Sequence, residues 1–416
     1  MAEDIFIVGV GMTAFGKMLD RSVKSLVAEA VNGALADAGA TVADVDVALF
    51  SNATQAIMEG QHAVAGQVAL RAMGFAGLPI INVENACASA STAVYQAVAM
   101  LRAGMSEVAL AVGVEKMHDA DKAKSSAIFD GAWDVHEVDS VLAGLSGIGA
   151  GVSPPEGTPQ GVRAPFMQLY ADMARGHMRE FGTTQRQLAA VSAKNHHHST
   201  INPLSQFQKD FSIDDVLAAT VIAWPLTLPM CSPISDGAAA AILCTRSALA
   251  RFPDAAPVQL LSSVLTSGSD RAWSEFDRHL CRVAALKAFD EAGVGPSDIS
   301  VAEVHDASAF AEIVQIENLG LCEIGQGGWM SERGETHLGG RIPINPSGGL
   351  ESKGHPIGAT GLGQLFELTQ QLRGRAGKRQ VEGARIAVAE NGGGFHGVEE
   401  AAAVVTILGR VNGARA

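Results

Sequence analysis

The chain has 416 residues, of which 47% are hydrophobic and 18% charged, so it can build one large domain or two ordinary ones. Its formal net charge of −14, without a Lys/Arg-rich run, argues against nucleic-acid binding, and no stretch approaches the roughly 18 uninterrupted apolar residues of a membrane span. The five scattered cysteines form no CxxC pair and Met1–Asp4 lacks a basic signal region, so we expect a cytoplasmic protein without a zinc knot or disulfide framework.

The first predicted helix ends at Gly39 and leads through a short loop into a buried strand that ends at Ser51. A second apolar strand, residues 80–83, is followed by Cys87 and by small residues that predict a helix ending near Arg102. Cys87 therefore stands where a strand turns into a helix N-terminus, and the free N–H groups there favour a thiolate. From position alone, a packing role as a small buried side chain is about as common as a reactive one.

The long segment between Met117 and Ser235 has no counterpart elsewhere in the chain. Residues 144–161 are rich in Gly and Pro and predict a loop, whereas residues 166–194 predict a helical stretch. We interpret this segment as an insertion that covers a cleft.

The second half of the chain repeats the first. The helix, Gly stop and buried strand return 254 residues later, with Gly293 in the place of Gly39 and His305 in the place of Ser51. The repeat does not itself require a histidine at position 305, because its partner is a serine. Alternating strands and helices predict parallel-rich sheets covered by helices, and two similar halves predict strand ends that face one central cleft.

Three further motifs lie at predicted strand ends or turns. His305 ends the repeated strand, and the Gly and Pro that flank His355 fix a sharp turn that precedes a helix. Residues 391–394, Asn-Gly-Gly-Gly, leave backbone N–H groups uncovered that can hold an oxyanion. A single histidine or Gly-rich turn is more often structural. Together with Cys87, however, two imidazoles and an amide nest are the inventory of covalent acyl transfer.

These motifs resemble the thiolases, specifically those of the sterol-carrier-protein type. The similarity runs along almost the whole chain and includes residues 113–117, 194–199, 202–208, 235–241, 305–306, 345–361 and 371–380. The resemblance implies an α/β thiolase fold, a duplicated five-layered αβαβα arrangement with a loop-domain insertion. It implies an N-terminal half at residues 1–258 and a C-terminal half at 259–416, with an inserted loop domain at 117–235 that carries most coenzyme A contacts.

The resemblance also implies a role for each matching residue. Cys87 takes the acyl group, His355 accepts the thiol proton and His305 polarises the thioester oxygen. The backbone N–H groups of Cys87 and Gly394 hold the second oxyanion. Coenzyme A and acyl-coenzyme A are then substrates, and neither a bound cofactor nor a metal ion is expected.

The chain departs from the family pattern at the second cysteine, which in many thiolases moves a proton at the substrate α-carbon. The two usual places for it hold Glu390-Asn391 and Ala307, and the loop after Gly394 is longer by a few residues. One interpretation is that Glu390 or His396 replaces the missing acid/base. The other is that proton transfer at carbon is lost, and the protein transfers or hydrolyses acyl groups or works with another protein.

The resulting prediction is an acyl-coenzyme A thiolase that cleaves or forms 3-oxoacyl thioesters in fatty acid or steroid degradation, with branched or steroid side chains as substrates. One alternative is a non-thiolytic relative, either a retro-aldol lyase or an acetyltransferase, acting with an OB-fold, zinc-ribbon partner protein. Another is a catalytically silent acyl-binding protein. The resemblance further implies a homodimer or homotetramer that binds acyl-coenzyme A, and we expect no nucleic-acid or membrane partner.

Overall fold

A computed structural model describes residues 3–162 and 164–411 of the chain. Its strands are β1 (Ile5–Met12), β2 (Val47–Ser51), β3 (Ile80–Val83), β4 (Val108–Glu115), β5 (Val221–Ala223), β6 (Leu226–Thr227), β7 (Gly237–Thr245), β8 (Val258–Ser267), β9 (Val301–Glu303), β10 (Ile386–Gly393) and β11 (Ala402–Arg410). Its helices are α1 (Val23–Ala38), α2 (Gln55–Glu59), α3 (Ala65–Arg71), α4 (Ser89–Arg102), α5 (Lys122–Ala127), α6 (Val138–Ile148), α7 (Pro165–Phe181), α8 (Gln185–Ser199), α9 (Ile213–Leu217), α10 (Leu280–Ala292), α11 (Ala309–Asn318), α12 (Gly327–Glu332) and α13 (Thr360–Leu372). Within these residues, none of the helices combines the length and the hydropathy that a bilayer crossing requires.

The main sheet is arranged symmetrically about the neighbours β1 and β8. Nine strands of the described chain follow the order β3-β2-β4-β7-β1-β8-β11-β10-β9, so β7, β4 and β2 match β11, β10 and β9 outward from the centre. An isolated bridge between Ala302 and Ile344 takes the place that β3 has in the first half. The repeat in the sequence is therefore a repeat of the structure.

The sheet contains fewer parallel pairs than the sequence predicts. Only the β2–β3, β2–β4 and β9–β10 pairs are parallel in the described sheet, and the other five pairs are antiparallel. The reason is that the Ala-rich strand closing each half, β7 or β11, lies between the parallel strands and the central strand. Both of its neighbours run in the opposite direction.

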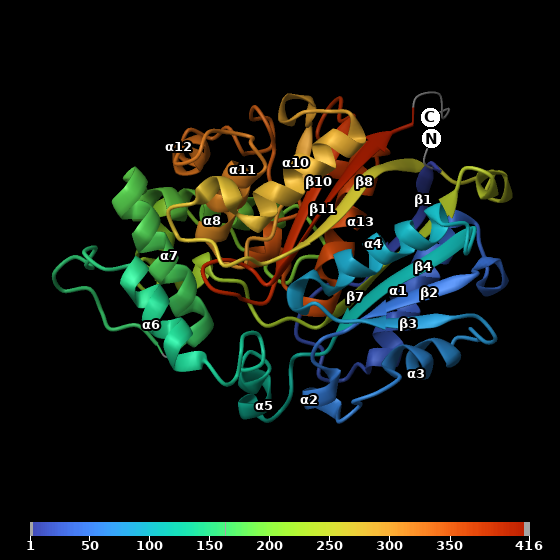
Figure 1. The fold of residues 1–416 in the computed structure, drawn as a ribbon, viewed down its shortest axis with the longest axis horizontal. Coiled ribbons are helices and arrows are strands. Elements are labelled where there is room, and N and C mark those ends of the chain that lie inside the picture. The colour runs from blue at the N-terminus through green and yellow to red at the C-terminus, as the bar shows by residue number, and fades with distance from the viewer. Residues whose placement is uncertain (1–2, 163, 412–416) are drawn as a thin grey trace.

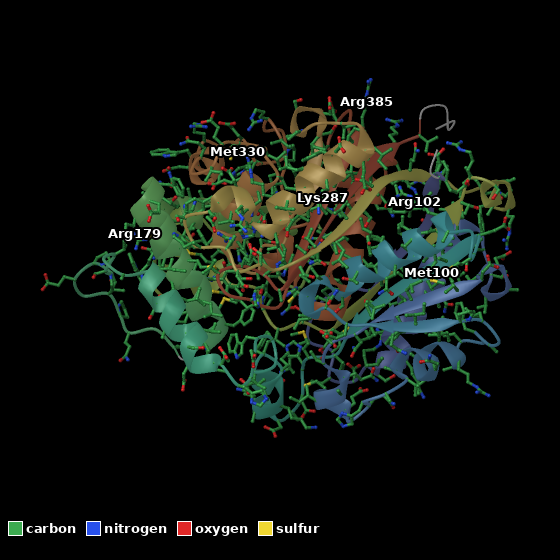
Figure 2. The ribbon with its side chains drawn as sticks, in the orientation of Figure 1. Met100, Arg102, Arg179, Lys287, Met330 and Arg385 are labelled. Atoms are coloured by element: carbon green, nitrogen blue, oxygen red, sulfur yellow. The ribbon has the colours of Figure 1, made fainter. Side chains whose placement is uncertain are left out.

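The layers follow from which side chains share a core. Helices α4 and α13 pack together with the inner faces of both halves of the sheet in one apolar cluster. The outer face of the first half is covered by α1, and that of the second half by α10 and α11. This gives the expected α, β, α, β, α order, with α4 and α13 in the middle (Figure 1). Arg102 at the end of α4 donates to the Leu261 carbonyl on β8, across the two halves (Figure 2).

Residues 117–235 contribute helices α5 to α9, which lie mostly to one side of the sheet (Figure 1). The helical stretch predicted over residues 166–194 consists of two helices, because Gly182 adopts a φ of +74° and Thr184 caps the start of α8. The predicted loop at 144–161 begins later than expected, since α6 continues to Ile148. Arg179 on α7 donates to the Ile148 and Ala150 carbonyls at the end of α6 (Figure 2).

Candidate active site

Cys87 lies in the tight turn that joins β3 to α4. The preceding residue, Ala86, has a φ of +47°, a conformation that non-Gly residues adopt rarely and mostly at functional sites. A single 3₁₀ turn, Ala86–Ala88, then leads directly into α4. Cys87 is 9% exposed and lines a cavity of about 400 Å³, whose other walls are mainly apolar and include Met117, Phe129 and Phe166. The thiol is therefore both sheltered and reachable.

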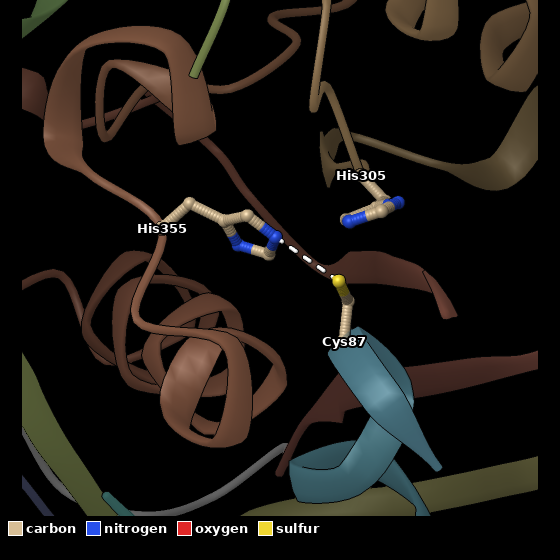
Figure 3. Close-up of side chains that lie close together, drawn as sticks. All are labelled: Cys87, His305 and His355. Carbon is tan, nitrogen blue, oxygen red and sulfur yellow. Dashed lines mark hydrogen bonds between the residues drawn. The ribbon is translucent and has the colours of Figure 1, made fainter. Parts of the chain in front are cut away.

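His355 brings an imidazole to this thiol from the other half of the chain. Its Nε2 lies 3.2 Å from the Cys87 Sγ (Figure 3). Its Nδ1 lies 2.7 Å from the Thr360 hydroxyl, which itself donates to the Pro356 carbonyl at 3.0 Å. Because that hydroxyl hydrogen is already used, Thr360 can only accept from Nδ1, which must carry the ring hydrogen. Nε2 then presents a lone pair to the thiol, as a general base requires.

His305 is the third member of the group. Its ring centroid lies 5.2 Å from that of His355, and one ligand atom from each of Cys87, His305 and His355 falls within 4.8 Å of the others (Figure 3). Both ring nitrogens of His305 are buried and have no hydrogen-bond partner among the described residues. A buried polar group without a partner costs free energy unless a ligand completes it, so the ring is available to a substrate oxygen.

The electrostatics of the three groups favour neutral forms at rest. Burial raises the pKa of Cys87 to about 12, although the N–H groups of Gly394 and of Cys87 itself act in the opposite direction. Burial lowers the pKa of His305 to about 4 and that of His355 well below its usual value. In the resting protein, the loss of solvent around Cys87 therefore raises its pKa more than the helix N-terminus lowers it, and the thiol is neutral.

The Gly-rich segment approaches the nucleophile closely. A side chain at Gly393 would collide with the backbone of Asn85 and Ala88 in the nucleophile turn. Only a glycine allows this approach, and the N–H groups of the next residue, Gly394, and of Cys87 itself lower the pKa of the thiol against the effect of burial. Two backbone N–H groups near the sulfur are the kind of donors that an oxyanion site needs.

A buried carboxylate, Glu115, joins the two halves next to the site. It accepts hydrogen bonds from the Asn52 side chain, from the backbone and hydroxyl of Thr54, and from the Gly358 N–H in the turn after His355. Sequence reasoning assigned no role to this residue. Its only signal was its place in a family-like stretch, which did not reveal contacts to residues 61 to 243 positions away.

The two candidates for the missing acid/base lie in different surroundings. Glu390 is fully buried on β10. Its Oε2 accepts a hydrogen bond from the backbone N–H of His305 at 3.0 Å, and its Oε1 lies 3.3 Å from the Cys281 Sγ. Its pKa is raised by burial to about 8. His396 is on the surface, with half of its side chain exposed and Nε2 3.3 Å from Asp270. The residues that line the cavity include Ala307 but not His396.

Among residues 3–162 and 164–411, two sets of side chains have the spacing of metal ligands. Cys87, His305 and His355 form the first, and His279, Cys281 and Glu400 the second. In the second set, Nδ1 of His279 accepts the Cys281 N–H, so in the neutral ring Nε2 carries the hydrogen and cannot ligate. The first set suits thiol activation, and a chelator control separates that role from metal binding.

Comparisons with known proteins agree over most of the chain. A family model described as the thiolase N-terminal domain matches residues 5–216, and one described as thiolase C-terminal domain-like matches residues 265–410. Acetyl-CoA acetyltransferase of Methanothermobacter thermautotrophicus is 39% identical over 402 residues, which cover 95% of this chain and 97% of that protein. Sterol carrier protein 2 of Bos taurus is 38% identical over 93% of this chain and 69% of that protein.

A solved structure described as the Ltp2-ChsH2(DUF35) aldolase has the same fold, with a TM-score of 0.77 and 23% identity over 99% of both chains. At that identity the likeness concerns the fold alone. The two family models and the full-length relatives carry the assignment, because they span both halves of the duplication. The chain therefore belongs to the thiolase family of acyl-coenzyme A acyltransferases.

Proposed function

We propose that the protein cleaves or forms 3-oxoacyl-coenzyme A thioesters through an acyl group held on Cys87. The observation that carries this proposal is the 3.2 Å contact between the Cys87 Sγ and the Nε2 of His355, whose tautomer Thr360 sets. A thiol with a raised pKa needs a base at the moment of attack, and a neutral imidazole within hydrogen-bond reach supplies it.

In the cleavage direction, His355 takes the thiol proton as the sulfur attacks the 3-oxo carbon. His305 donates to the thioester oxygen of the departing group, while the N–H groups of Cys87 and Gly394 stabilise the oxyanion on the attacked carbon. Each such donor contributes roughly 3–4 kcal/mol in comparable sites. The C2–C3 bond then breaks, C2 takes up a proton, and coenzyme A removes the acyl group from Cys87.

The cavity supports a substrate larger than acetyl. Its volume of about 400 Å³ lies in the range of small-molecule sites, and its walls are mainly apolar. We include branched or steroid side chains in the proposal, in keeping with the sterol carrier protein relative. We further propose that the protein forms a homodimer or a homotetramer. We also propose an OB-fold, zinc-ribbon partner protein, since the name Ltp2-ChsH2(DUF35) of the similar structure joins two components.

The test is to incubate the protein with acetyl-coenzyme A and a panel of 3-oxoacyl thioesters and to look for an acyl adduct by intact mass, with and without a chelator. We expect one acyl group per chain, located on Cys87 and absent in Cys87→Ser. Without an adduct from any thioester, the acyl-transfer proposal fails. Cleavage of a 3-hydroxyacyl thioester to a carbonyl compound without an adduct would instead identify a lyase.

A further inference from the structure

Aromatic side chains gather on one wall of the cavity that holds Cys87. Phe, Trp and Tyr make up only 5% of the chain. Even so, Phe166 in that wall has four aromatic neighbours, whose ring centroids lie between 5.5 and 6.3 Å from its own; they are Phe129, Trp133, Tyr170 and Phe395. Aromatic pairs are favourable at these distances. A scarce residue type that is concentrated beside the nucleophile indicates a role for this wall in the choice of substrate.

The inserted segment and the Gly-rich segment build the aromatic cluster together. Phe166 and Tyr170 lie four residues apart on α7, so both point to the same side of that helix. The Trp133 ring stacks on that of Phe166 at an angle of 18°. Phe395 follows the Gly-rich segment directly, and its N–H donates to the Ala132 carbonyl at 2.8 Å. This hydrogen bond ties residues 129–133 to the loop beside the nucleophile and so holds the wall in place.

Phe166 lies between the Cys87 cavity and a second, smaller cavity. Phe166 and Phe129 are half-buried and line the Cys87 cavity. Tyr170 and Phe395, which contact Phe166 and are buried, line an inner cavity of about 40 Å³ whose walls are mainly apolar. The two cavities share no lining residue among those that the structure describes. The aromatic rings therefore separate the two cavities.

The chemistry of coenzyme A decides which end of a substrate meets this wall. A thioester at Cys87 has an acyl group on one side and the coenzyme A moiety on the other, and coenzyme A carries charged phosphates that are costly to bury. The exposed residues Ile57 and Glu84 line the Cys87 cavity and mark its opening to solvent. The wall at Phe166 is instead backed by buried rings. The coenzyme A moiety therefore extends through the opening, and the acyl group faces the aromatic wall.

We propose that Phe166 is a specificity-determining residue, and that the site takes compact acyl groups that end in an aromatic ring. This inference rests on the proposed function and narrows its substrates. A terminal ring extends the cluster through the edge or offset contacts that aromatic pairs prefer, and it loses less conformational freedom on binding than a flexible linear chain does. A linear chain of medium length instead meets the Phe166 ring when its thioester is placed at Cys87.

The test measures acylation of Cys87 by a set of acyl-coenzyme A thioesters, in a rapid-quench experiment read by intact mass. Phenylacetyl, cyclohexylacetyl and octanoyl thioesters differ at the end of the acyl group, and every rate is divided by the rate with acetyl-coenzyme A. We expect the wild type to react with the phenylacetyl thioester about tenfold faster, or more, than with the octanoyl one. Its preference for phenylacetyl over cyclohexylacetyl should be about two- to tenfold, which corresponds to one aromatic pair.

Two substitutions at one position separate the length limit from the recognition of a ring. Phe166→Ala deepens the Cys87 cavity by one ring, so the octanoyl ratio should rise by about tenfold or more. Phe166→Leu keeps much of the bulk without an aromatic face. It should still disfavour the octanoyl thioester but lose the preference of phenylacetyl over cyclohexylacetyl. Phe207→Ala is the matched control, because Phe207 is exposed and lines neither cavity. It should leave every ratio unchanged.

The inference is overturned if the wild type reacts with octanoyl-coenzyme A as fast as with phenylacetyl-coenzyme A, or if Phe166→Ala leaves the octanoyl ratio unchanged. Equal changes of the ratios in Phe207→Ala and Phe166→Ala would overturn it as well. In each of these cases, acylation by acetyl-coenzyme A would leave the proposed function standing. A protein that no thioester acylates would remove the proposed function, and this inference with it.

Discussion

Thr360→Val isolates the contribution of one hydrogen bond to nucleophile activation. The substitution keeps the shape of the side chain but removes the hydroxyl that accepts from Nδ1 of His355 at 2.7 Å. An imidazole N–H left unpaired in a buried site costs about 1–3 kcal/mol. The ring can avoid part of this cost by moving its hydrogen to Nε2, but that tautomer cannot accept the Cys87 proton. Since 1.4 kcal/mol corresponds to about tenfold, we expect the acylation rate to fall by about 10- to 100-fold.

The assay is the rate of acyl-enzyme formation from acetyl-coenzyme A in a rapid-quench experiment read by intact mass. Thr369→Val is a matched control, because Thr369 lies on the same helix, is fully buried, and has a hydroxyl without a hydrogen-bond partner in the described structure. It should acylate like the wild type. Wild-type acylation by Thr360→Val would refute the assignment of the His355 tautomer, and an equal loss in Thr369→Val would show that only packing of α13 is measured.

Because burial raises the pKa of Cys87 to about 12, alkylation by iodoacetamide should keep accelerating between about pH 7 and pH 10, and a plateau below about pH 8 would contradict a neutral resting thiol. The raised pKa of Glu400 means that the folded state keeps a proton that the unfolded chain has lost, so this residue's contribution to stability should fall as pH rises from 4.5 to about 7. In urea unfolding, the wild type should therefore lose up to about 3 kcal/mol relative to Glu400→Gln over that range, whereas a constant difference would count against the shift. Gly393→Ala should slow the acylation of Cys87 by roughly tenfold or more, because it displaces the turn that holds the nucleophile. Gly147→Ala, on a helix with open space around that position, should leave the acylation rate unchanged.

Features with a local cause could be predicted from the sequence. Gly39 ends α1 in the left-handed conformation, and the residues around Cys87 and His355 form turns where Gly, Pro and small side chains require them. The helical stretch at residues 166–194 was predicted without its break at Gly182, which depends on a left-handed backbone conformation at a single residue. The antiparallel placement of β7 and β11 was missed because strand order depends on contacts distant in sequence.

The difference between local causes and contacts distant in sequence also explains what the sequence could not show about the site. Cys281 meets Glu390 across 109 positions and Glu400 across 119, and no local pattern connects them. The direction of the Cys87 pKa shift also depends on how completely the finished fold excludes water. The position of Cys87 at a helix N-terminus could be predicted from neighbouring residues. The burial that raises its pKa in spite of that position could not.

The duplication leaves a second, related place that has taken another course. Ser51 corresponds to His305, and Gly358 in the turn before α13 corresponds to Cys87 in the turn before α4; there the serine hydroxyl donates to the glycine carbonyl at 2.6 Å. At this place a hydrogen bond joins the two halves of the chain, whereas at the corresponding place Cys87 and His305 lie close together. Because Cys87 comes from the first half and both histidines from the second, this hydrogen bond belongs to the contact surface on which the alignment of the nucleophile with its base depends.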